Sequence, residues 1–456
     1  MTLDWLIERM ASQGDAPAVI EGTAIHSYAA LLSAVSKWTT ALADRGITGR
    51  VVSVEAEYGL EGIAAVIAAA MGGNILVPIS MAADAHRQMF LAMAEVEFRI
   101  TPADGPHGIV ALGRRAGHVY YKTLHRKATP GLVLFSSGTS GTPKAAVHDL
   151  GVLLQKFVAQ RHAYRTLVFL QLDHIGGLNT LFYTLSNGGT VVIAEGRLPT
   201  EVCRAVERHR VQLLPTSPTF LNMLLLSEEQ HRHDLSSLEL ITYGTEPMPA
   251  HTLERVHAAF PGVRLLQTYG LSELGILRSQ SREPGSLWVR VGGEGFQTKI
   301  VDGRLFVKAQ SAMLGYLNAP SPFDEEGYFD TGDLVERDGE WLRILGRATE
   351  VINVGGSKVL PTEVENLLLA MENVADVVVH GEKSPIMGQI VVATVRLAHA
   401  EDPAAFKTRM RLFCQGRLAD HEIPARVRFS DSLHSARFKK QRGVAAAVQL
   451  ERTEAV

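Results

Sequence analysis

The residues with the clearest chemical potential lie between Leu132 and Lys144. An apolar run, Leu132–Phe135, leads into serines, threonines and glycines that end in Pro143 and Lys144. Glycines let a backbone approach an anion such as a polyphosphate, successive N–H groups form an anion-binding nest, and the hydroxyls and lysine add donors and charge. The spacing differs from the Walker loop, in which Gly-Lys-Ser/Thr follows four variable residues. A hydroxyl-rich surface loop is the alternative, but the strand before it and the Pro-Lys after it favour an anion site.

Further along the chain, glycine recurs beside acidic, aromatic or basic side chains. A carboxylate beside glycine suits a metal ion or sugar hydroxyls, although each such acid alone could also be a solvated residue or a turn former. The segments are Phe169–Gly177, which contains His174; Tyr243–Pro247; Thr268–Glu273; Gly327–Asp333; Gly346–Arg347; Gly355–Lys358; and Pro361–Glu365.

Taken together and in the same order, these segments resemble the signature motifs of the AMP-forming adenylation enzymes. This superfamily comprises acyl- and aryl-CoA synthetases, the adenylation domains of nonribosomal peptide synthetases, and firefly luciferase. The chain is most similar in look to the acyl- and aryl-CoA ligases. One such match is weak evidence, whereas several in register along nearly the whole chain are strong.

The resemblance implies an ATP site assembled from these segments. Tyr269 offers an aromatic face to the adenine beside Gly270, whose missing side chain leaves room for the base. Asp333 is suited to accept hydrogen bonds from both ribose hydroxyls, and Arg347 to donate to the same sugar. The implied ATP-binding residues are Ser136, Ser137, Gly138, Thr139, Ser140, Gly141, Thr142, Lys144, Gly244, Thr245, Glu246, Pro247, Thr268, Tyr269, Gly270, Ser272, Asp333 and Arg347.

Glu273 and His174 are expected, from the resemblance, to act in catalysis. Joining a carboxylate to an α-phosphate brings two anions together, so the site must neutralise charge on the phosphates. Glu273 is suited to hold a Mg²⁺ ion that bridges phosphate oxygens, because Mg²⁺ prefers hard oxygen ligands. The matching histidine of CoA ligases lies beside the acyl carboxylate and the thiol tunnel, so His174 is expected to position the acid. A helix-start or core histidine is the alternative, and no second ligand at suitable spacing makes it a metal site.

The third expected catalytic residue is a lysine near the C-terminus, where the chain departs from the family pattern. Family members end in Pro-Arg-Thr-x-x-Gly-Lys, whose lysine contacts the carboxylate and the α-phosphate during adenylation. This chain reads Leu-His-Ser-Ala-Arg-Phe-Lys-Lys over 433–440, without the proline and the glycine. Ungapped counting from Leu433 selects Lys440, and a shift of one residue selects Lys439. A solvated basic tail is the alternative.

The resemblance also implies an acyl pocket. Apart from one histidine its residues are apolar or small, which suits an apolar carboxylic acid. Amino-acid-activating relatives usually carry an aspartate here, and Asp173 lies nearby, but the His-Ile-Gly-Gly that follows is more like acyl- or aryl-CoA ligases. Whether the acid is aromatic, aliphatic or an amino acid stays open. The implied pocket residues are His174, Tyr243, Leu271, Leu274 and Gly275.

Composition narrows the class of protein. Apolar residues make up 46% of the chain and charged residues 20%, which is typical of a soluble globular protein. The net charge of −3 gives no bulk electrostatic reason to expect nucleic acid or an anionic membrane as a partner. Cys203 and Cys414 lie far apart without metal-ligand spacing, so neither a disulfide framework nor a zinc site is expected, and a cytoplasmic location fits.

No membrane span or signal peptide is expected. The most apolar segment, Ile63–Ile79, is interrupted by glycines, an asparagine and a proline, whereas a span needs roughly 20 uninterrupted apolar residues. The start of the chain, Met1–Gln13, mixes acidic with apolar residues, which argues against a signal peptide.

The order of expected elements indicates more than one unit. Up to about residue 270, apolar runs such as Val51–Val54 alternate with helical patterns, which implies α/β layers with largely parallel sheets. From about residue 287 to 345, short strands split by turns indicate a small antiparallel, barrel-like β unit. After Gly346, a helix over Glu363–Met371, strands over Val374–Val379 and Gln389–Val395, and a further helix indicate an α+β domain of about 100 residues.

The expected fold class is therefore α/β. A large N-terminal domain of layered αβ subdomains and a β-barrel-like subdomain precedes a small, mobile α+β C-terminal domain. We expect residues 1–347 to form the adenylation core and residues 348–456 the lid. Thr349 stands where the family often has Asp or Lys, and it can absorb the backbone change that a domain rotation needs.

The expected function is ATP-dependent activation of a small-molecule carboxylic acid to an acyl-adenylate, with release of pyrophosphate, followed by transfer to the thiol of coenzyme A. ATP, Mg²⁺ and coenzyme A are the implied cofactors. A carrier-protein phosphopantetheine or an amine is an alternative acceptor. A protein of another class, which binds nucleotide or acyl-adenylate with impaired catalysis, stays open because the proline and the glycine near Lys440 are missing.

Overall fold

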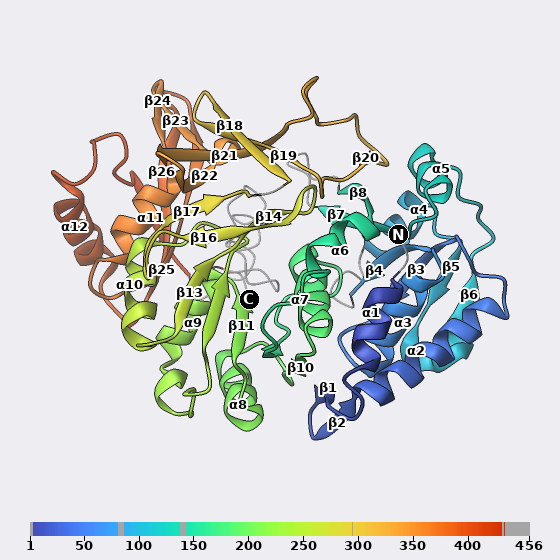
Figure 1. The fold of residues 1–456 in the computed structure, drawn as a ribbon. Helices are drawn as coiled ribbons and strands as arrows, with labels where there is room; N and C mark the ends of the chain where they lie inside the picture. The colour runs from blue at the N-terminus through green and yellow to red at the C-terminus, as the bar shows by residue number, and fades with distance from the viewer. Residues whose placement is uncertain (1–2, 81–85, 137–142, 294, 431–432, 434–456) are drawn as a thin grey trace, which may run out of the picture.

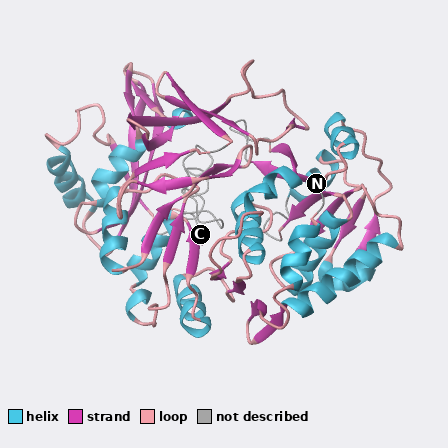
Figure 2. Cartoon of the chain, in the orientation of Figure 1, coloured by secondary structure: helices cyan, strands magenta, loops and turns pink. Residues whose placement is uncertain are grey.

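The computed structural model describes residues 3–80, 86–136, 143–293, 295–430 and 433. Within these ranges the chain forms two mixed sheets with flanking helices, a curved antiparallel sheet and a C-terminal α+β unit (Figure 1). Helices cover both large sheets, whereas the curved sheet consists almost wholly of strands and turns (Figure 2).

The first large sheet carries the strand that leads into the hydroxyl-rich loop. Its order is β20-β8-β7-β4-β3-β5-β6, with parallel pairing among β3, β4, β5 and β7. Side chains alternate between its faces as a pleated strand requires: Leu132 and Leu134 of β7 join one apolar cluster and Val133 joins another. The bounds are β3 (Val51–Glu55), β4 (Ile75–Ile79), β5 (Phe98–Ile100), β6 (Ile109–Ala111), β7 (Gly131–Ser136), β8 (Lys144–Asp149) and β20 (Gly315–Tyr316).

The second large sheet has the order β13-β12-β11-β9-β10-β1-β2. Its neighbouring strands pair in parallel except in the β1–β2 hairpin. Val191 and Val192 of β10 again face opposite clusters. The bounds are β1 (Pro17–Glu21), β2 (Ala24–Ser27), β9 (Arg165–Leu167), β10 (Thr190–Ile193), β11 (Leu213–Thr216), β12 (Leu240–Tyr243) and β13 (Arg264–Gln267).

Helices complete the layers on both faces of the sheets. Side chains of α1, α2, α3, α6 and α7 share one apolar core with the inner faces of both sheets. Helices α4 and α5 cover the outer face of the first sheet, and α8, α9 and α10 the outer face of the second. The expected α/β layers are confirmed. The bounds are α1 (Asp4–Ala11), α2 (Tyr28–Ala43), α3 (Leu60–Met71), α4 (Arg87–Met93), α5 (Val119–Arg126), α6 (Leu150–Leu154), α7 (Ile175–Ser186), α8 (Pro199–His209), α9 (Pro218–Ser227) and α10 (Ala250–Ala259).

The antiparallel unit is a half-barrel sheet with the order β16-β17-β22-β21-β19-β18, preceded by a separate hairpin of β14 and β15. The expected β unit is therefore confirmed, although it begins at Ser279 rather than near residue 287. The short polar strand β16 offered no apolar run to signal its start. The bounds are β14 (Tyr269–Leu271), β15 (Gly275–Leu277), β16 (Ser279–Ser281), β17 (Trp288–Val291), β18 (Phe296–Val301), β19 (Arg304–Ala309), β21 (Phe329–Asp338) and β22 (Trp341–Arg347).

The C-terminal unit has its own apolar core beneath a sheet of order β24-β23-β26-β25, with β27 beside β26. The expected separate α+β domain is confirmed. The short 3₁₀ turn Ala348–Glu350 follows β22, so the predicted boundary after Arg347 falls at the end of a strand. The bounds are β23 (Ile352–Val354), β24 (Ser357–Val359), α11 (Pro361–Leu369), β25 (Val374–Ser384), β26 (Gly388–Leu397), α12 (Pro403–Cys414) and β27 (Arg426–Phe429).

The C-terminal unit packs against the second large sheet's helices, with α11 beside α10 and β22 (Figure 1). Asn222 Nδ2 on α9 donates to the carbonyl oxygen of Ala375 at 3.2 Å, and Thr362 Oγ1 donates to the carbonyl oxygen of Leu345. These polar contacts help to join the C-terminal unit to the rest of the described chain.

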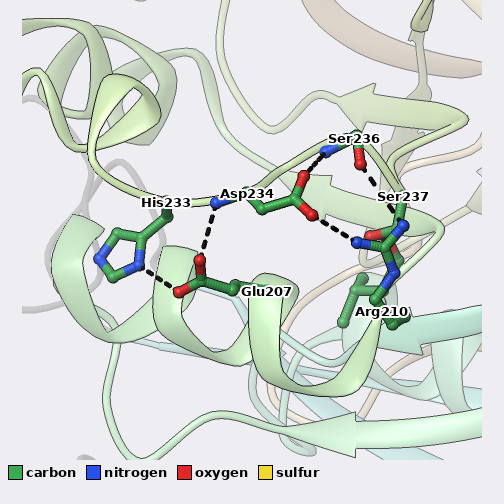
Figure 3. A network of polar contacts seen from close by, with 7 residues as sticks. Glu207, Arg210, His233, Asp234, Ser236 and Ser237 are labelled. Carbon is green, nitrogen blue, oxygen red and sulfur yellow. Dashed lines mark hydrogen bonds and ion pairs between the residues drawn. The ribbon is translucent and has the colours of Figure 1, made fainter.

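A polar network fixes the end of α8 on the outer surface (Figure 3). Arg210, in the left-handed region, donates to Asp234 at 2.7 Å and to Ser236, while Glu207 contacts the ring of His233 at 2.8 Å and accepts the Asp234 N–H. Such partly exposed ion pairs add little stability. We therefore assign the network only a local role, which is to pair the polar groups at the end of α8.

Candidate active site

The expected nucleotide-binding segments begin where parallel strands end. Strands β9, β11, β12 and β13 run in the same direction, so the segments that follow them emerge at one edge of the second sheet, where ligands bind in open α/β sheets. Gly244 follows β12 and Thr268 follows β13. The Thr268 N–H and Oγ1 both donate to the carbonyl oxygen of Tyr243, at 2.7 and 3.1 Å. A Cβ atom on Gly244 would lie 2.5 Å from Thr268 Oγ1, which explains the glycine.

The first large sheet brings the ends of the hydroxyl-rich loop together. Ser136 and Lys144 are opposite each other in the antiparallel β7–β8 pair. Ser136 Oγ donates to Glu273 Oε1 at 3.2 Å, and the Tyr316 hydroxyl donates to the same oxygen at 2.8 Å. Lys144 Nζ lies 5.0 Å from the centre of the Tyr316 ring. Two predicted ATP-binding residues and the predicted metal ligand therefore meet around one tyrosine.

The Glu273 carboxylate fits a Mg²⁺ site that substrate phosphates would complete. It is buried, at 8% exposure, and its Oε1 accepts hydrogen bonds from the hydroxyls of both Ser136 and Tyr316. Mg²⁺ is commonly held by one or two carboxylates together with substrate phosphates. Burial, followed by the nearby Glu273 charge, raises the pKa of Tyr316, so this phenol stays a donor at neutral pH. Within the described ranges no three histidine, cysteine or acidic side chains form a ready-made metal site.

The expected ribose-binding pair is assembled across the half-barrel. Asp333 and Arg347 are register partners of β21 and β22, and Arg347 Nε lies 2.8 Å from Asp333 Oδ1. The hydroxyl of Tyr269 donates to Asp333 Oδ2 at 2.6 Å. Burial raises the pKa of Asp333, and the Arg347 charge opposes that shift. Since each carboxylate oxygen has more than one acceptor site, both can still accept a ribose hydroxyl.

The expected catalytic histidine has a structural task as well. His174 precedes α7, and its Nδ1 accepts the N–H of Gly176 at 3.0 Å. A Cβ atom on Gly177 would lie 1.9 Å from the carbonyl oxygen of Gln171, so the turn cannot accept another residue unchanged. The helix-start interpretation is thus confirmed for Nδ1. The predicted contact of His174 with the acid therefore involves the rest of the ring rather than Nδ1.

The expected acyl-pocket residues lie on two neighbouring elements. Leu271, Leu274 and Gly275 belong to the β14–β15 hairpin, against which α7 packs. Leu274 is fully buried and Leu271 nearly so, in the cluster that lines the half-barrel. Tyr243, 2% exposed, belongs to the apolar cluster of the second sheet. The structure therefore brings the leucines and the glycine together, whereas Tyr243 lies in a different apolar cluster.

Glu246 and Pro247 extend in another direction from Gly244. Thr245 has a φ of +75°, which turns the chain. Glu246 Oε1 accepts the N–H of Thr219 at 2.8 Å, which satisfies a donor at the start of α9. Both residues line a cavity of about 40 Å³ between α9 and α11. The Glu246 side chain thus binds the start of α9 at the domain interface. The predicted contact of this segment with adenine would therefore be made by its backbone.

Comparison with known proteins places this geometry in a family. Residues 6–317 match the AMP-binding enzyme family, and residues 363–440 match the AMP-binding enzyme C-terminal domain. The chain is an AMP-binding enzyme. The indoleacetate–CoA ligase of Aromatoleum aromaticum is 30% identical over 462 residues, which cover 89% of this chain and 90% of that protein.

Solved structures share the fold of this AMP-binding enzyme. The ATP-bound MatB of Rhodopseudomonas palustris superposes with a TM-score of 0.80 at 23% identity, covering 100% of this chain and 99% of that one. The amide bond synthetase McbA of Marinactinospora thermotolerans superposes with a TM-score of 0.76 at 23% identity, covering 97% and 98%. These structures show the shared mixed α/β fold, and the family match makes this chain an adenylate-forming enzyme.

Some expected site residues of the AMP-binding enzyme lie outside the described ranges. They are Ser137, Gly138, Thr139, Ser140, Gly141 and Thr142 of the loop, and Lys439 and Lys440 near the C-terminus. Their roles stay predictions. Among the helices that are described, none is long and apolar enough to cross a membrane.

Two residues of the site were not anticipated. Tyr316 enters it because β20 pairs with β8, and Thr331 because its carbonyl oxygen accepts from Arg347 Nη1 at 2.7 Å while its hydroxyl accepts the Asp333 N–H at 3.1 Å. Thr331 lies within the expected Gly327–Asp333 segment, so a closer reading of that segment could have included it. No sequence signal marked Tyr316, because its role depends on a long-range strand pair.

Proposed function

We propose that this AMP-binding enzyme is an acid–thiol ligase that activates an apolar carboxylic acid with ATP and transfers the acyl group to coenzyme A. One observation carries the proposal. The β14–β15 hairpin region joins the ribose carboxylate, through Tyr269 and Asp333, to the phosphate side, through Glu273 and Ser136. A single short element thus spans from nucleoside to polyphosphate, as an adenylation site needs.

The first half-reaction joins the acid to the nucleotide. A carboxylate oxygen attacks the α-phosphorus of ATP, the bond to the β-phosphate oxygen breaks, and pyrophosphate leaves while the acyl-adenylate remains. Asp333 and Arg347 hold the ribose, and Lys144 with the loop donors bind the phosphates. A Mg²⁺ ion held by Glu273 would neutralise phosphate charge. Lys440 is assigned to the carboxylate and the α-phosphate, with Lys439 as its rival.

The second half-reaction moves the acyl group. The coenzyme A thiol releases its proton to solvent and its sulfur attacks the acyl carbon. The bond to the AMP oxygen then breaks, which yields a thioester and AMP. His174 is assigned to the path between acid and thiol, acting through the part of the ring that does not cap α7. The division into a core of residues 1–347 and a lid of residues 348–456, with Thr349 at the joint, would let the lid serve both steps.

Coenzyme A is preferred as acceptor because a relative that covers 89% of this chain and 90% of its own length is an indoleacetate–CoA ligase. The same similarity favours an aryl or arylacetic acid, which suits the apolar residues Leu271, Leu274 and Tyr243. A carrier-protein phosphopantetheine would offer the same thiol. An amine acceptor is the remaining alternative, in keeping with the fold shared with an amide bond synthetase.

Product analysis tests the acceptor. The enzyme is incubated with ATP, Mg²⁺ and indole-3-acetate, benzoate, cinnamate, hexanoate or phenylalanine, and then with coenzyme A, a phosphopantetheinylated carrier protein or an amine. Mass spectrometry should find an acyl-CoA and AMP in equal amounts. An amide or an acylated carrier, formed faster than the acyl-CoA, would replace the coenzyme A assignment. ATP binding without AMP formation for any acid would favour a binding protein.

A further inference from the structure

The turn that presents Glu273 is held through its backbone. It connects β14 to β15, and the carbonyl oxygens of three successive residues each accept a hydrogen bond from a different donor. Ser272 O accepts from His148 Nε2 at 2.6 Å, Glu273 O from the N–H of Met313 at 2.8 Å, and Leu274 O from Ser311 Oγ at 2.7 Å. This set of bonds fixes the direction in which the Glu273 side chain leaves the turn.

His148 is the unexpected member of this set. It lies on β8 among buried alanine and valine, and its side chain is fully buried. A carbonyl oxygen only accepts, so Nε2 carries the proton and donates to Ser272 O. A buried polar ring without a partner would cost free energy relative to an apolar side chain. Its Nε2 satisfies the Ser272 carbonyl oxygen, whereas Nδ1 is buried and has no hydrogen-bond partner among the described residues.

A second donor from the same chain segment holds the next strand. Lys156 Nζ donates to the carbonyl oxygen of Ile276 on β15 at 2.9 Å. The segment that carries His148 and Lys156 begins at Lys144, directly after the hydroxyl-rich loop. One continuous stretch therefore carries the end of that loop and anchors both sides of the hairpin turn.

We propose that His148 is a positioning residue, which holds the Ser272 carbonyl so that the Glu273 carboxylate faces Ser136 at the end of β7. This role rests on the proposed function, in which Glu273 holds Mg²⁺. His148 does not touch the nucleotide or the metal ion. It acts by restricting the turn, so its removal costs the part of ATP binding that depends on Mg²⁺.

Calorimetric titration of the whole enzyme with ATP, in Mg²⁺ and separately in EDTA, tests the proposal. His148→Leu keeps the bulk but removes the donor, and we expect the Kd for ATP in Mg²⁺ to rise about tenfold. The Kd in EDTA should change less than about twofold. His148→Gln, whose amide nitrogen can take the place of Nε2, should stay within about threefold of the wild type in Mg²⁺. His257→Leu, which alters an exposed histidine on α10, is the matched control and should change neither value.

Two further variants keep the result decisive. The Mg²⁺-dependent gain is the increase in ATP affinity in Mg²⁺ over that in EDTA. His148→Asn carries an amide too short to reach Ser272 O, so it should also lose this gain. It replaces the leucine variant if that variant does not fold. Glu273→Gln sets the size of the gain that can be lost. If Glu273→Gln removes the gain while His148→Leu and His148→Asn keep it, the positioning role is wrong and the metal assignment stands. If Glu273→Gln keeps the gain, both are wrong. Equal losses in the glutamine and leucine variants would also overturn the role, because packing rather than the donor would then matter.

Discussion

The hydroxyl of Tyr269 lies 2.6 Å from Oδ2 of Asp333, although 64 residues separate them in the chain. Arg347 contacts the other carboxylate oxygen at 2.8 Å. The carboxylate is buried, so these two donors set its direction before any ligand arrives. The tyrosine therefore links the segment expected beside adenine to the residue expected to bind ribose.

This link leads to the first prediction. Asp333→Ala should abolish detectable ATP binding, and Tyr269→Phe should weaken it about tenfold, because a hydrogen bond to a charged group is lost. Fluorescence titration with an ATP analogue measures both. Tyr328→Phe, which removes an exposed hydroxyl bonded to Gln297, is the control and should bind normally. Unchanged affinity in Asp333→Ala would remove the ribose assignment.

The second prediction concerns the C-terminal lysines. Lys440→Ala should cripple adenylation, by at least about a hundredfold in rate, while sparing thioester formation from a preformed acyl-adenylate. Rates of the two half-reactions, measured separately, check this. If Lys439→Ala gives that pattern and Lys440→Ala does not, the register is off by one residue. If both variants retain adenylation, the basic tail is solvated.

The third prediction follows from a buried amine. Burial, followed by the Arg161 charge, lowers the pKa of Lys156 to about 7. Between about pH 7 and pH 10 the unfolded chain holds a proton at Lys156 that the folded chain lacks, so this group's contribution to the free energy of unfolding rises with pH. Below about pH 7 the full cost of burying the charge is present.

Lys156→Met removes this titration and, at every pH, the hydrogen bond to Ile276 O. The melting temperature of the variant relative to the wild type should therefore fall by several degrees between pH 7 and pH 10. Lys122→Met, at an exposed lysine on α5, should show a constant difference. A constant difference in Lys156→Met as well would mean that the amine is charged in the folded state up to pH 10.

The fourth prediction tests the first turn of α7. Gly177→Ala places a methyl group 1.9 Å from the carbonyl oxygen of Gln171, so the backbone must shift. We expect a fall in melting temperature of about 5 °C or more. Gly117→Ala, where no heavy atom lies within 4 Å of the added Cβ, should change it by less than about 1 °C. Equal melting temperatures for the two variants would contradict the packing of this turn.

Much of the fold and part of the site could be predicted from local sequence. The alternation of apolar runs and helical patterns revealed the α/β layers, and the motif residues Ser136, Lys144 and Glu273 do meet in space. Tyr316 and His148 could not be predicted, because one depends on the β20–β8 pair and the other on contact between β8 and the β14–β15 turn. Such contacts join segments more than 100 residues apart, and no local periodicity encodes them.

Glu246 illustrates the opposite case. Its motif suggested the nucleotide, yet its side chain satisfies the start of α9 beside the C-terminal unit. Because Thr245 turns the backbone with a positive φ, neighbouring motif residues point in different directions. A linear motif therefore predicts where the turn lies, but it does not predict which group each side chain contacts.

ATP–pyrophosphate exchange across a panel of aryl, short-chain, long-chain and amino acids is the most direct test of the central claim. The account predicts exchange that requires Mg²⁺, depends on one class of apolar acid, and disappears in Asp333→Ala. Absence of exchange with every acid, in a protein that binds ATP, would contradict the ligase assignment and favour a protein that binds nucleotide without catalysing adenylation.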